Sequence, residues 1–534
     1  MAARSSKPGP KQGAGSGWPV AVIFLLILAL PSYAQQPPPS SLAASQLVEK
    51  ARQFLRNHDP QQARLFLEEA VTRDPKSAEA WSLLAESYAQ LGWEEKAIRA
   101  YQTTLELRPD SPDALYNLGI LQWKRKHYED ALRCFQTFRQ QQPRDYEVLL
   151  PLADCLFELG RATEGQQVVE EMTNTAADSP EANFQAGRLL LHHRQVAAAL
   201  APLTRALASR PDWDEARLLL ALAESRLNHP SRVAELLRDH PMPSAPLYPQ
   251  LLGVALAQLG HYQEAIPLLE GLVRGQEGEK VTYLELLASC YVAMDRLEEA
   301  RRFAERAVAE GGGESGLLAL ANILQMQDRN LEVIRLLEPH RSEFSTSAKY
   351  IFTLGLSYYK NGSYSRAIDL FDIATRLDPS LAQAHYLKGN ALARLGKPGP
   401  SLACYEEAVR LAPDDALYHF QLGQVLSTLG EKPRAEAELQ RSLELNEGYA
   451  QARYELARIY FESSRTDLAR AQLEEAIKAD PAFEGSFYLL SQVYARLGRR
   501  EDALRMLKQF QAIKQQGQEK QRVLIQSSSK RQSQ

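Results

Sequence analysis

Cysteine and long apolar runs are both scarce in this sequence of 534 residues. It has four cysteines, and no Cys-x-x-Cys pair or Cys/His spacing typical of a zinc site occurs. The longest apolar run, residues 20–30, has eleven residues. A helix needs about 20 apolar residues to cross a bilayer. The sequence therefore excludes a disulfide-rich fold, and it contains no apolar run of the length that usually spans a membrane.

The sequence also lacks a large excess of charge of one sign, and it lacks catalytic motifs. The net charge is −4 at pH 7, and no basic stripe that would collect nucleic-acid phosphates is present. The patterns G-x-S-x-G, H-E-x-x-H and the P-loop are absent. Ten histidines are scattered, and the only adjacent pair, His192-His193, is interpreted as a solvated helix end. We therefore expect no enzyme, no cofactor, no metal site and no nucleic-acid partner.

A stretch of two amphipathic helices, residues 347–380, shows what the sequence has instead. Apolar residues recur with a 3.6-residue period on both sides of Asn361-Gly362, a pair that tolerates positive φ. Asp378-Pro379 ends the second helix, because proline cannot continue it. Gly355 and Ala367 are small where the two helices are expected to cross. The stretch therefore predicts a helix-turn-helix unit of 34 residues.

This unit recurs along the chain. Fourteen copies fit, and their first residues, counted below as position 1, are residues 44, 78, 112, 146, 180, 214, 246, 281, 314, 348, 382, 416, 450 and 484. Alanine recurs at position 20 as Ala63, Ala97, Ala131, Ala199, Ala265, Ala300, Ala435, Ala469 and Ala503. The pattern of a large residue, Leu, Gly and Tyr followed by Ala, Phe, Ala and Pro resembles the tetratricopeptide repeat (TPR).

The resemblance implies an all-α fold, an α-solenoid in which about 14 helix pairs form a right-handed superhelix over residues 44–517. It implies about 28 helices and no sheet. It also implies a concave surface, lined by the first helix of each pair, that holds peptides or protein partners. Exported bacterial members commonly serve envelope assembly, secretion or exopolysaccharide export, and we expect a non-enzymatic scaffold of this kind. The alternative is an accessory subunit that recruits an envelope enzyme or binds glycan.

Composition and repeat regularity divide the chain. We expect a signal peptide at 1–34, a Pro-rich linker at 35–43, an N-terminal TPR array at 44–245, irregular TPR units at 246–347, a regular C-terminal array at 348–517 and a polar tail at 518–534. Residues 228–316 contain prolines and glycine runs. They fit either a joint between two arrays or irregular loops in one continuous superhelix.

The N-terminus has the composition of a secretory signal. Arg4, Lys7 and Lys11 precede the apolar run, and small residues stand three and one before a cut between Ala34 and Gln35. We expect cleavage there and an exported chain, periplasmic or extracellular, without a membrane span in the mature protein. The alternative is an uncleaved segment that anchors the chain in the inner membrane.

The C-terminal array suggests where a partner binds. Position 5 of its first helices is aromatic in all five units: Phe352, Tyr386, Phe420, Tyr454 and Tyr488. Position 9, one turn further along the same face, is Leu356, Asn390, Gln424, Arg458 and Gln492. We expect this ladder to line a peptide-binding groove, with aromatic rings giving apolar contact and polar groups pairing with peptide carbonyls. The ladder is also explained by aromatics that are frequent in the family, and the second candidate is an N-terminal surface around Tyr116, Trp123 and Phe157.

The cysteines fit small apolar core residues. Cys134 and Cys155 are the exception, because they lie on consecutive helices that are expected to pack together. A disulfide between them is a hypothesis that depends on an oxidising compartment.

Overall fold

The computed structural model describes residues 43–532, with gaps at 144, 146 and 275–279. Over these residues every regular element is helical: 28 α-helices, one 3₁₀ helix and no strand. The all-α prediction and the expected number of helices are thus confirmed. None of the described helices combines the length and the apolar composition needed to cross a membrane. The expected signal peptide, its cleavage site at Ala34 and Gln35, and most of the linker lie outside the described residues.

The chain divides into two units, the first ending at Asn228 and the second beginning at His229. The described helices of unit 1 are α2 (Ala44–Arg56), α3 (Pro60–Arg73), α4 (Ala78–Gln90), α5 (Glu94–Leu107), α6 (Pro112–Lys124), α7 (Tyr128–Gln141), α8 (Leu149–Glu158), α9 (Ala162–Thr175), α10 (Pro180–His192), α11 (Val196–Ser209) and α12 (Asp214–Arg226).

Unit 2 contains the remaining elements. They are α13 (Pro230–Leu237), α14 (Leu247–Gln258), α15 (Tyr262–Arg274), α16 (Lys280–Ala293), α17 (Leu297–Ala309), α18 (Gly313–Met326), α19 (Asn330–Leu337), the 3₁₀ helix η2 (Glu338–His340), α20 (Ala348–Lys360), α21 (Tyr364–Leu377), α22 (Ala382–Arg394), α23 (Pro398–Leu411), α24 (Ala416–Thr428), α25 (Lys432–Leu445), α26 (Ala450–Glu462), α27 (Thr466–Ala479), α28 (Glu484–Arg496) and α29 (Arg500–Gln532).

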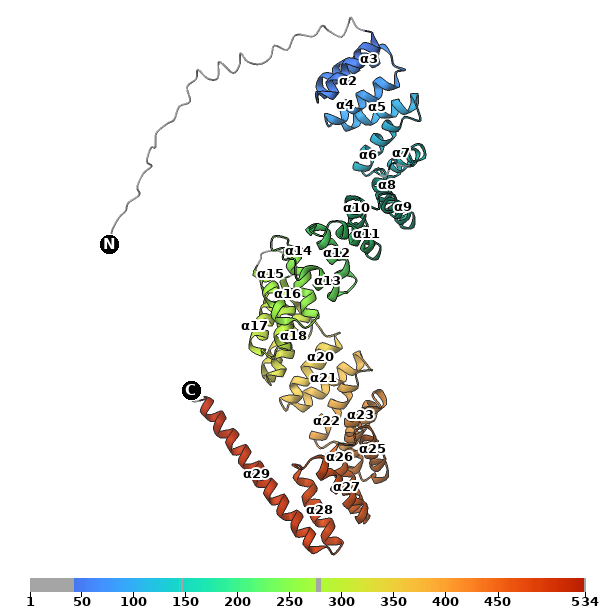
Figure 1. Cartoon of the computed structure of the whole chain (residues 1–534). Helices are drawn as coiled ribbons and strands as arrows, with labels where there is room; N and C mark the ends of the chain where they lie inside the picture. Colours follow the sequence, from blue (N-terminus) through green and yellow to red (C-terminus); the bar gives the residue numbers. More distant parts are fainter. Residues whose placement is uncertain (1–42, 144, 146, 275–279, 533–534) are drawn as a thin grey trace, which may run out of the picture. The chain divides into compact units, whose positions relative to one another are not determined.

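Within each unit, helices adjacent in sequence pack against each other as hairpins (Figure 1). Small residues at position 8 of the first helix allow this approach. The Gly355 backbone faces the ring of Phe371, and a Cβ added to Gly355 would lie 3.0 Å from that ring. Ala367 and Phe371 are fully buried in the same hairpin. Close packing of this kind is what gives a solenoid its continuous core.

The turn between the two helices of a pair has one geometry throughout. Position 15 adopts positive φ in all fourteen repeats, at His58, Gly92, Lys126, Gly160, Arg194, Asn228, Gly260, Asp295, Asp328, Gly362, Gly396, Gly430, Ser464 and Gly498. The next N–H then donates to the carbonyl at position 11, as from Ser363 to Tyr358 at 2.9 Å. This bond is the one that ends a helix in a Schellman motif.

The last helix differs from the expectation for the C-terminus. Residues 518–534 were expected to form a polar tail, whereas α29 continues without interruption from Arg500 to Gln532. Its sequence is rich in Gln, Lys, Glu and Arg, which are good helix formers.

Candidate binding surfaces

The predicted groove residues lie on the consecutive first helices α20, α22, α24, α26 and α28 of unit 2. These helices are neighbours in space as well as in repeat order, since α20 contacts α22, α24 contacts α26, and α26 contacts α28. The five position-5 rings differ in exposure. Phe420 is buried, Phe352, Tyr386 and Tyr454 are half-buried, and Tyr488 has 47% of its surface exposed.

Most of these rings already have an aromatic partner, either in the next repeat or at the residue that immediately precedes it. The ring centroids of Tyr386 and Tyr418 are 4.8 Å apart in a stacked arrangement. Phe420 lies 4.8 Å from Tyr449, and Tyr454 meets Phe483 edge-on at 5.2 Å. Aromatic pairs at such distances stabilise packing beyond their buried area. The ladder therefore holds consecutive repeats together, in addition to any contact that it makes with a ligand.

The spacing of aromatics in the sequence is a signal for these partners. The residue just before the next first helix is aromatic and stands 29 residues after the position-5 ring. This spacing is shared by three contacting pairs: Phe184 and Trp213, Phe420 and Tyr449, and Tyr454 and Phe483. An aromatic pair with this spacing therefore indicates packing between consecutive repeats.

Position 9 forms a polar network between α24 and α26. Arg458 donates to Glu455 at 2.9 Å and to Glu462 at 3.1 Å, and it reaches Ser427 Oγ on α24 at 3.0 Å. Gln424 Nε2 donates to Glu455 at 3.4 Å. Burial disfavours the charged guanidinium, but the two carboxylates outweigh it and raise the pKa of Arg458. Arg458 is thus a fixed cation whose donors are largely used within the protein.

The remaining position-9 residues, Leu356, Asn390 and Gln492, are half-buried. Asn390 Oδ1 accepts a hydrogen bond of 2.6 Å from the Tyr405 hydroxyl, and its amide nitrogen takes no part in that bond. The face thus offers a ligand mainly the exposed ring of Tyr488 and the amides of Asn390 and Gln492. Tyr488 also meets Phe510 of α29, with ring centroids 5.3 Å apart.

The second candidate surface is in unit 1, and the structure brings two of its three residues to one network. Trp123 Nε1 donates to Asp154 Oδ2 at 2.6 Å, and His193 Nε2 lies 2.6 Å from Asp154 Oδ1. Phe157 is buried and stacks on His193 at 4.8 Å. Tyr116 instead packs on Phe138, at 5.5 Å between ring centroids.

The hypothesised disulfide is not formed. Cys134 on α7 and Cys155 on α8 are both free thiols. Burial raises the pKa of Cys134 to about 11 and that of Cys155 to about 12. Both thiols are therefore neutral at pH 7 and unreactive, since the thiolate is the nucleophile in disulfide chemistry.

Comparison with known families agrees with this geometry. One tetratricopeptide repeat model matches residues 48–112, 95–131, 251–315, 352–416, 396–450 and 420–482, which together cover more than half of the chain. Two further tetratricopeptide repeat models match residues 122–186 and 486–509. The chain belongs to the tetratricopeptide repeat family. Repeat solenoids of this kind present extended concave binding surfaces to other molecules.

Curated relatives match only part of the chain. Hsp70-Hsp90 organizing protein 1 of Glycine max is 25% identical over 25% of this chain and 23% of its own length. The PEX5-related protein of Mus musculus is 36% identical over 15% of this chain and 14% of its own length. The aligned part thus spans less than a quarter of each of these relatives.

Solved structures also include similar folds. The chain YrrB, described as a TPR protein with an unusual peptide-binding site, is 27% identical, and the match covers 33% of this chain and 91% of that one, with a TM-score of 0.30. A chain of the APC/C hetero-tetramer Cut9-Hcn1 is 15% identical, with 92% of this chain and 95% of that one covered and a TM-score of 0.36.

Proposed function

We propose that the chain is an exported, non-enzymatic scaffold that binds an extended protein segment on the first-helix face of unit 2. The observation that carries the proposal is the row of position-5 aromatics on consecutive first helices, which reaches its most exposed ring at Tyr488. Tyr488 shares α28 with Gln492, whose side chain is half-buried. An exposed ring and an amide one turn apart supply apolar contact and hydrogen bonds together, as peptide-binding surfaces require.

The spacing of the helices suits an extended ligand. Neighbouring helices pack about 8–10 Å apart, and an extended chain rises about 3.3 Å per residue. One rung would therefore meet roughly every third residue of the ligand. A free C-terminal carboxylate is not the expected ligand, because position 5 is aromatic here, where some TPR domains place a lysine that binds this group. The relatives whose name describes the organising of Hsp70 and Hsp90 support a scaffold role in general terms.

Export is proposed on the N-terminal sequence alone. A basic start, an eleven-residue apolar run and small residues before Gln35 favour cleavage after Ala34. The setting that follows is the cell envelope or the exterior, with a role in envelope assembly, secretion or export as part of an envelope complex. Intact-mass measurement of the exported protein tests this: a mass that still includes residues 1–34 would contradict cleavage.

The binding proposal is tested by affinity capture with three immobilised proteins. The wild type, Tyr488→Ala and Leu468→Ala are each exposed to an envelope extract, and captured proteins are identified and then purified for titration. Leu468 lies on the second helix α27 and is 49% exposed, so it is a matched control for loss of an exposed apolar side chain. We expect Tyr488→Ala to weaken binding of the purified partner roughly ten-fold, about 1.4 kcal/mol, and Leu468→Ala to leave it unchanged.

The double variant Tyr454→Ala/Arg458→Ala removes one whole rung and serves as a second test once its helicity is checked. Undiminished binding by both groove variants would contradict the proposed face and direct attention to the surface around Trp123 in unit 1.

A further inference from the structure

Two histidines and a glutamate converge on one point in unit 1, in a place that the peptide-binding proposal does not use. Glu158 is the last residue of α8, His192 is the last residue of α10, and His193 caps α10. Glu158 and His192 occupy position 13 of consecutive repeats. Because α8 and α10 are contacting first helices, one repeat step places the two side chains next to each other.

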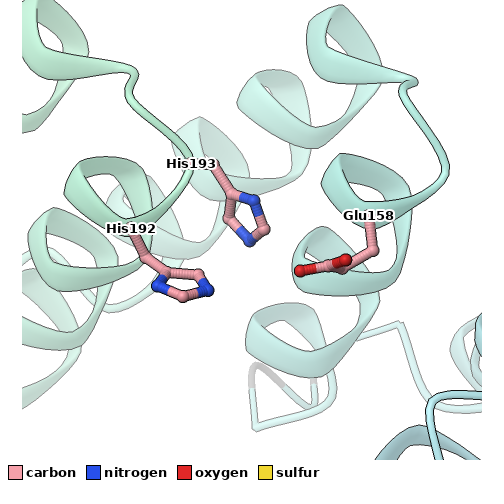
Figure 2. Close-up of side chains that lie close together, drawn as sticks. All are labelled: Glu158, His192 and His193. Carbon is pink, nitrogen blue, oxygen red and sulfur yellow. The ribbon is translucent and has the colours of Figure 1, made fainter.

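The three side chains lie within reach of a single ion. Figure 2 shows the carboxylate of Glu158 directed toward the two imidazole rings. One ligand atom from each residue lies within 4.8 Å of the other two. Around an ion with bonds of about 2.0–2.2 Å, tetrahedral ligand atoms are roughly 3.4 Å apart. Glu158 and His192 are exposed, so small side-chain rotations close this difference without moving the backbone.

His193 is the fixed member of the cluster. Its side chain is 12% exposed, stacks on Phe157 and is hydrogen-bonded through Nε2 to Asp154, whose side chain is 15% exposed. Trp123 Nε1 holds the other oxygen of Asp154. An ion bound at Nδ1 of His193 leaves the Asp154 bond in place as a supporting carboxylate–histidine pair. An ion bound at Nε2 has the Asp154 carboxylate beside it as a further oxygen ligand. In both geometries Asp154 strengthens the site.

The donor set selects the class of ion. Two imidazoles with a carboxylate suit Zn²⁺, Co²⁺, Ni²⁺ or Cu²⁺, whereas Ca²⁺ and Mg²⁺ prefer sites made of oxygen alone. We propose that Glu158, His192 and His193, supported by Asp154, bind a divalent transition-metal ion that links the fourth and fifth repeats.

A link at this place has a structural use. Helix α8 has ten residues, whereas the other first helices have twelve to fourteen, so less helix is available to pack on its neighbours. An ion that binds the folded unit, and not the unfolded chain, stabilises the folded state by mass action. The ion therefore makes up for the short helix by joining α8 directly to α10.

Titration of the metal-stripped full-length protein with Zn²⁺, followed by calorimetry, tests the proposal. We expect one ion bound per chain, an upward shift of the unfolding temperature with Zn²⁺, and at least ten-fold weaker binding in His192→Ala and Glu158→Gln. Both substituted residues are exposed, so the variants should fold like the wild type. Asp154→Asn should weaken binding by a similar factor, about ten-fold or more.

His261→Ala is the matched control. His261 stands beside Glu264 at 4.0 Å in unit 2 as a histidine–glutamate pair without a second imidazole. Its replacement should leave the affinity and the temperature shift unchanged. Titration with Co²⁺ distinguishes the four cysteines as the source of binding, because thiolate ligands give an absorption band that imidazole and carboxylate lack. Binding that persists in His192→Ala and Glu158→Gln, that is lost on alkylating the thiols, or that is absent altogether would overturn the proposal.

Discussion

At the scale of the residue, a left-handed backbone conformation recurs at position 15 of every repeat. Seven of the fourteen repeats have glycine there, and the others have residues such as Lys126, with φ of 62°. A residue with a Cβ pays about 1–2 kcal/mol for this conformation. The pair Asn361-Gly362 predicted the turn in one repeat. The repeat period extended this prediction to repeats that have no glycine at position 15. Composition alone could not identify Lys126 or Arg194 as turn residues.

Two substitutions in neighbouring repeats of unit 1 test this strain in opposite directions. A Cβ added to Gly92, with φ of 77°, would meet no atom within 4 Å, so Gly92→Ala changes backbone strain alone. We expect Gly92→Ala to lower the free energy of unfolding by about 1 kcal/mol and Lys126→Gly to raise it by about 0.5 kcal/mol. Urea denaturation measures both. Equal signs for the two variants would contradict the explanation.

Position 4 provides another recurring contact, which closes the loop between units. A side-chain donor there binds the carbonyl six residues earlier, as Trp81 does to Pro75 at 3.0 Å, Asn183 to Ala177 at 3.1 Å and His419 to Pro413 at 2.9 Å. These carbonyls follow the end of the preceding helix, where the backbone has no intrahelical partner. In α22 the same position is His385.

The position of His385 makes a pH dependence predictable. Burial lowers the pKa of this imidazole, and the nearby Glu407 opposes the effect only in part. In the unfolded chain the group has its ordinary pKa of about 6.5. The unfolded state therefore binds a proton first as the pH falls, and acid favours unfolding. Above about pH 7.5 both states are neutral and the contribution vanishes.

We expect the wild type to lose stability relative to His385→Asn between about pH 7.5 and pH 5.5. Asparagine is the matched replacement, because Asn183 fills the same position in unit 1 with a neutral donor. Thermal unfolding of both proteins across this range measures the difference. A gap between the two that stays constant with pH would show that His385 does not titrate differently on folding.

At the scale of elements, most hairpins place a small residue at position 8 opposite a large one at position 24; in the repeat that begins at residue 281 position 24 is Ala304. A Cβ added to Gly389 would lie 2.8 Å from the Tyr405 ring, and one added to Gly187 would lie 2.4 Å from Leu203. Real Cβ contacts are not that short, so the Tyr405 ring or the Leu203 side chain would have to move, or the helices would have to separate. Overpacking of this kind typically costs about 1–3 kcal/mol.

Gly389→Ala should therefore destabilise unit 2 by about 1–3 kcal/mol, although alanine is the better helix former. Gly399→Ala is the control: it lies on the next helix, α23, where an added Cβ meets nothing within 4 Å. It should be neutral or stabilising by up to about 1 kcal/mol. Denaturant midpoints compare the two variants. A stabilising Gly389→Ala would contradict the close helix crossing.

The sequence predicted these elements well where the period repeats and poorly where it does not. The register beginning at Ala44 places α2, and the same register places the hairpin of α20 and α21. It missed the continuation of α29 to Gln532, because a polar segment without a repeat pattern was expected to be a tail. The bonds made by Arg458 were not predicted either. Its ion pairs with Glu455 and Glu462 lie within α26. Its bond to Ser427 of the preceding repeat depends on a side-chain direction that spacing does not reveal.

At the scale of the whole molecule, the repeat period defines the family, and we expect function to reside in residues that depart from the repeat pattern. Tyr488 is more exposed than the other rings of the ladder, and Glu158, His192 and His193 bring possible metal ligands together from two repeats. Residues in consecutive repeats become neighbours through the repeat step itself. A sequence search for local motifs cannot find such sites unless it compares the same position from one repeat to the next.

Site-specific photo-crosslinking tests most directly whether a partner lies on the first helices of unit 2. A photoreactive amino acid is placed at position 488 on α28 or at position 468 on α27, and each protein is irradiated with its purified partner. The two sites have similar exposure, 47% and 49%, on different helices of the array. We predict a crosslink from 488 and none from 468. A crosslink from 468 alone, or none from 488 in a complex that forms normally, would contradict partner binding on the first helices of unit 2.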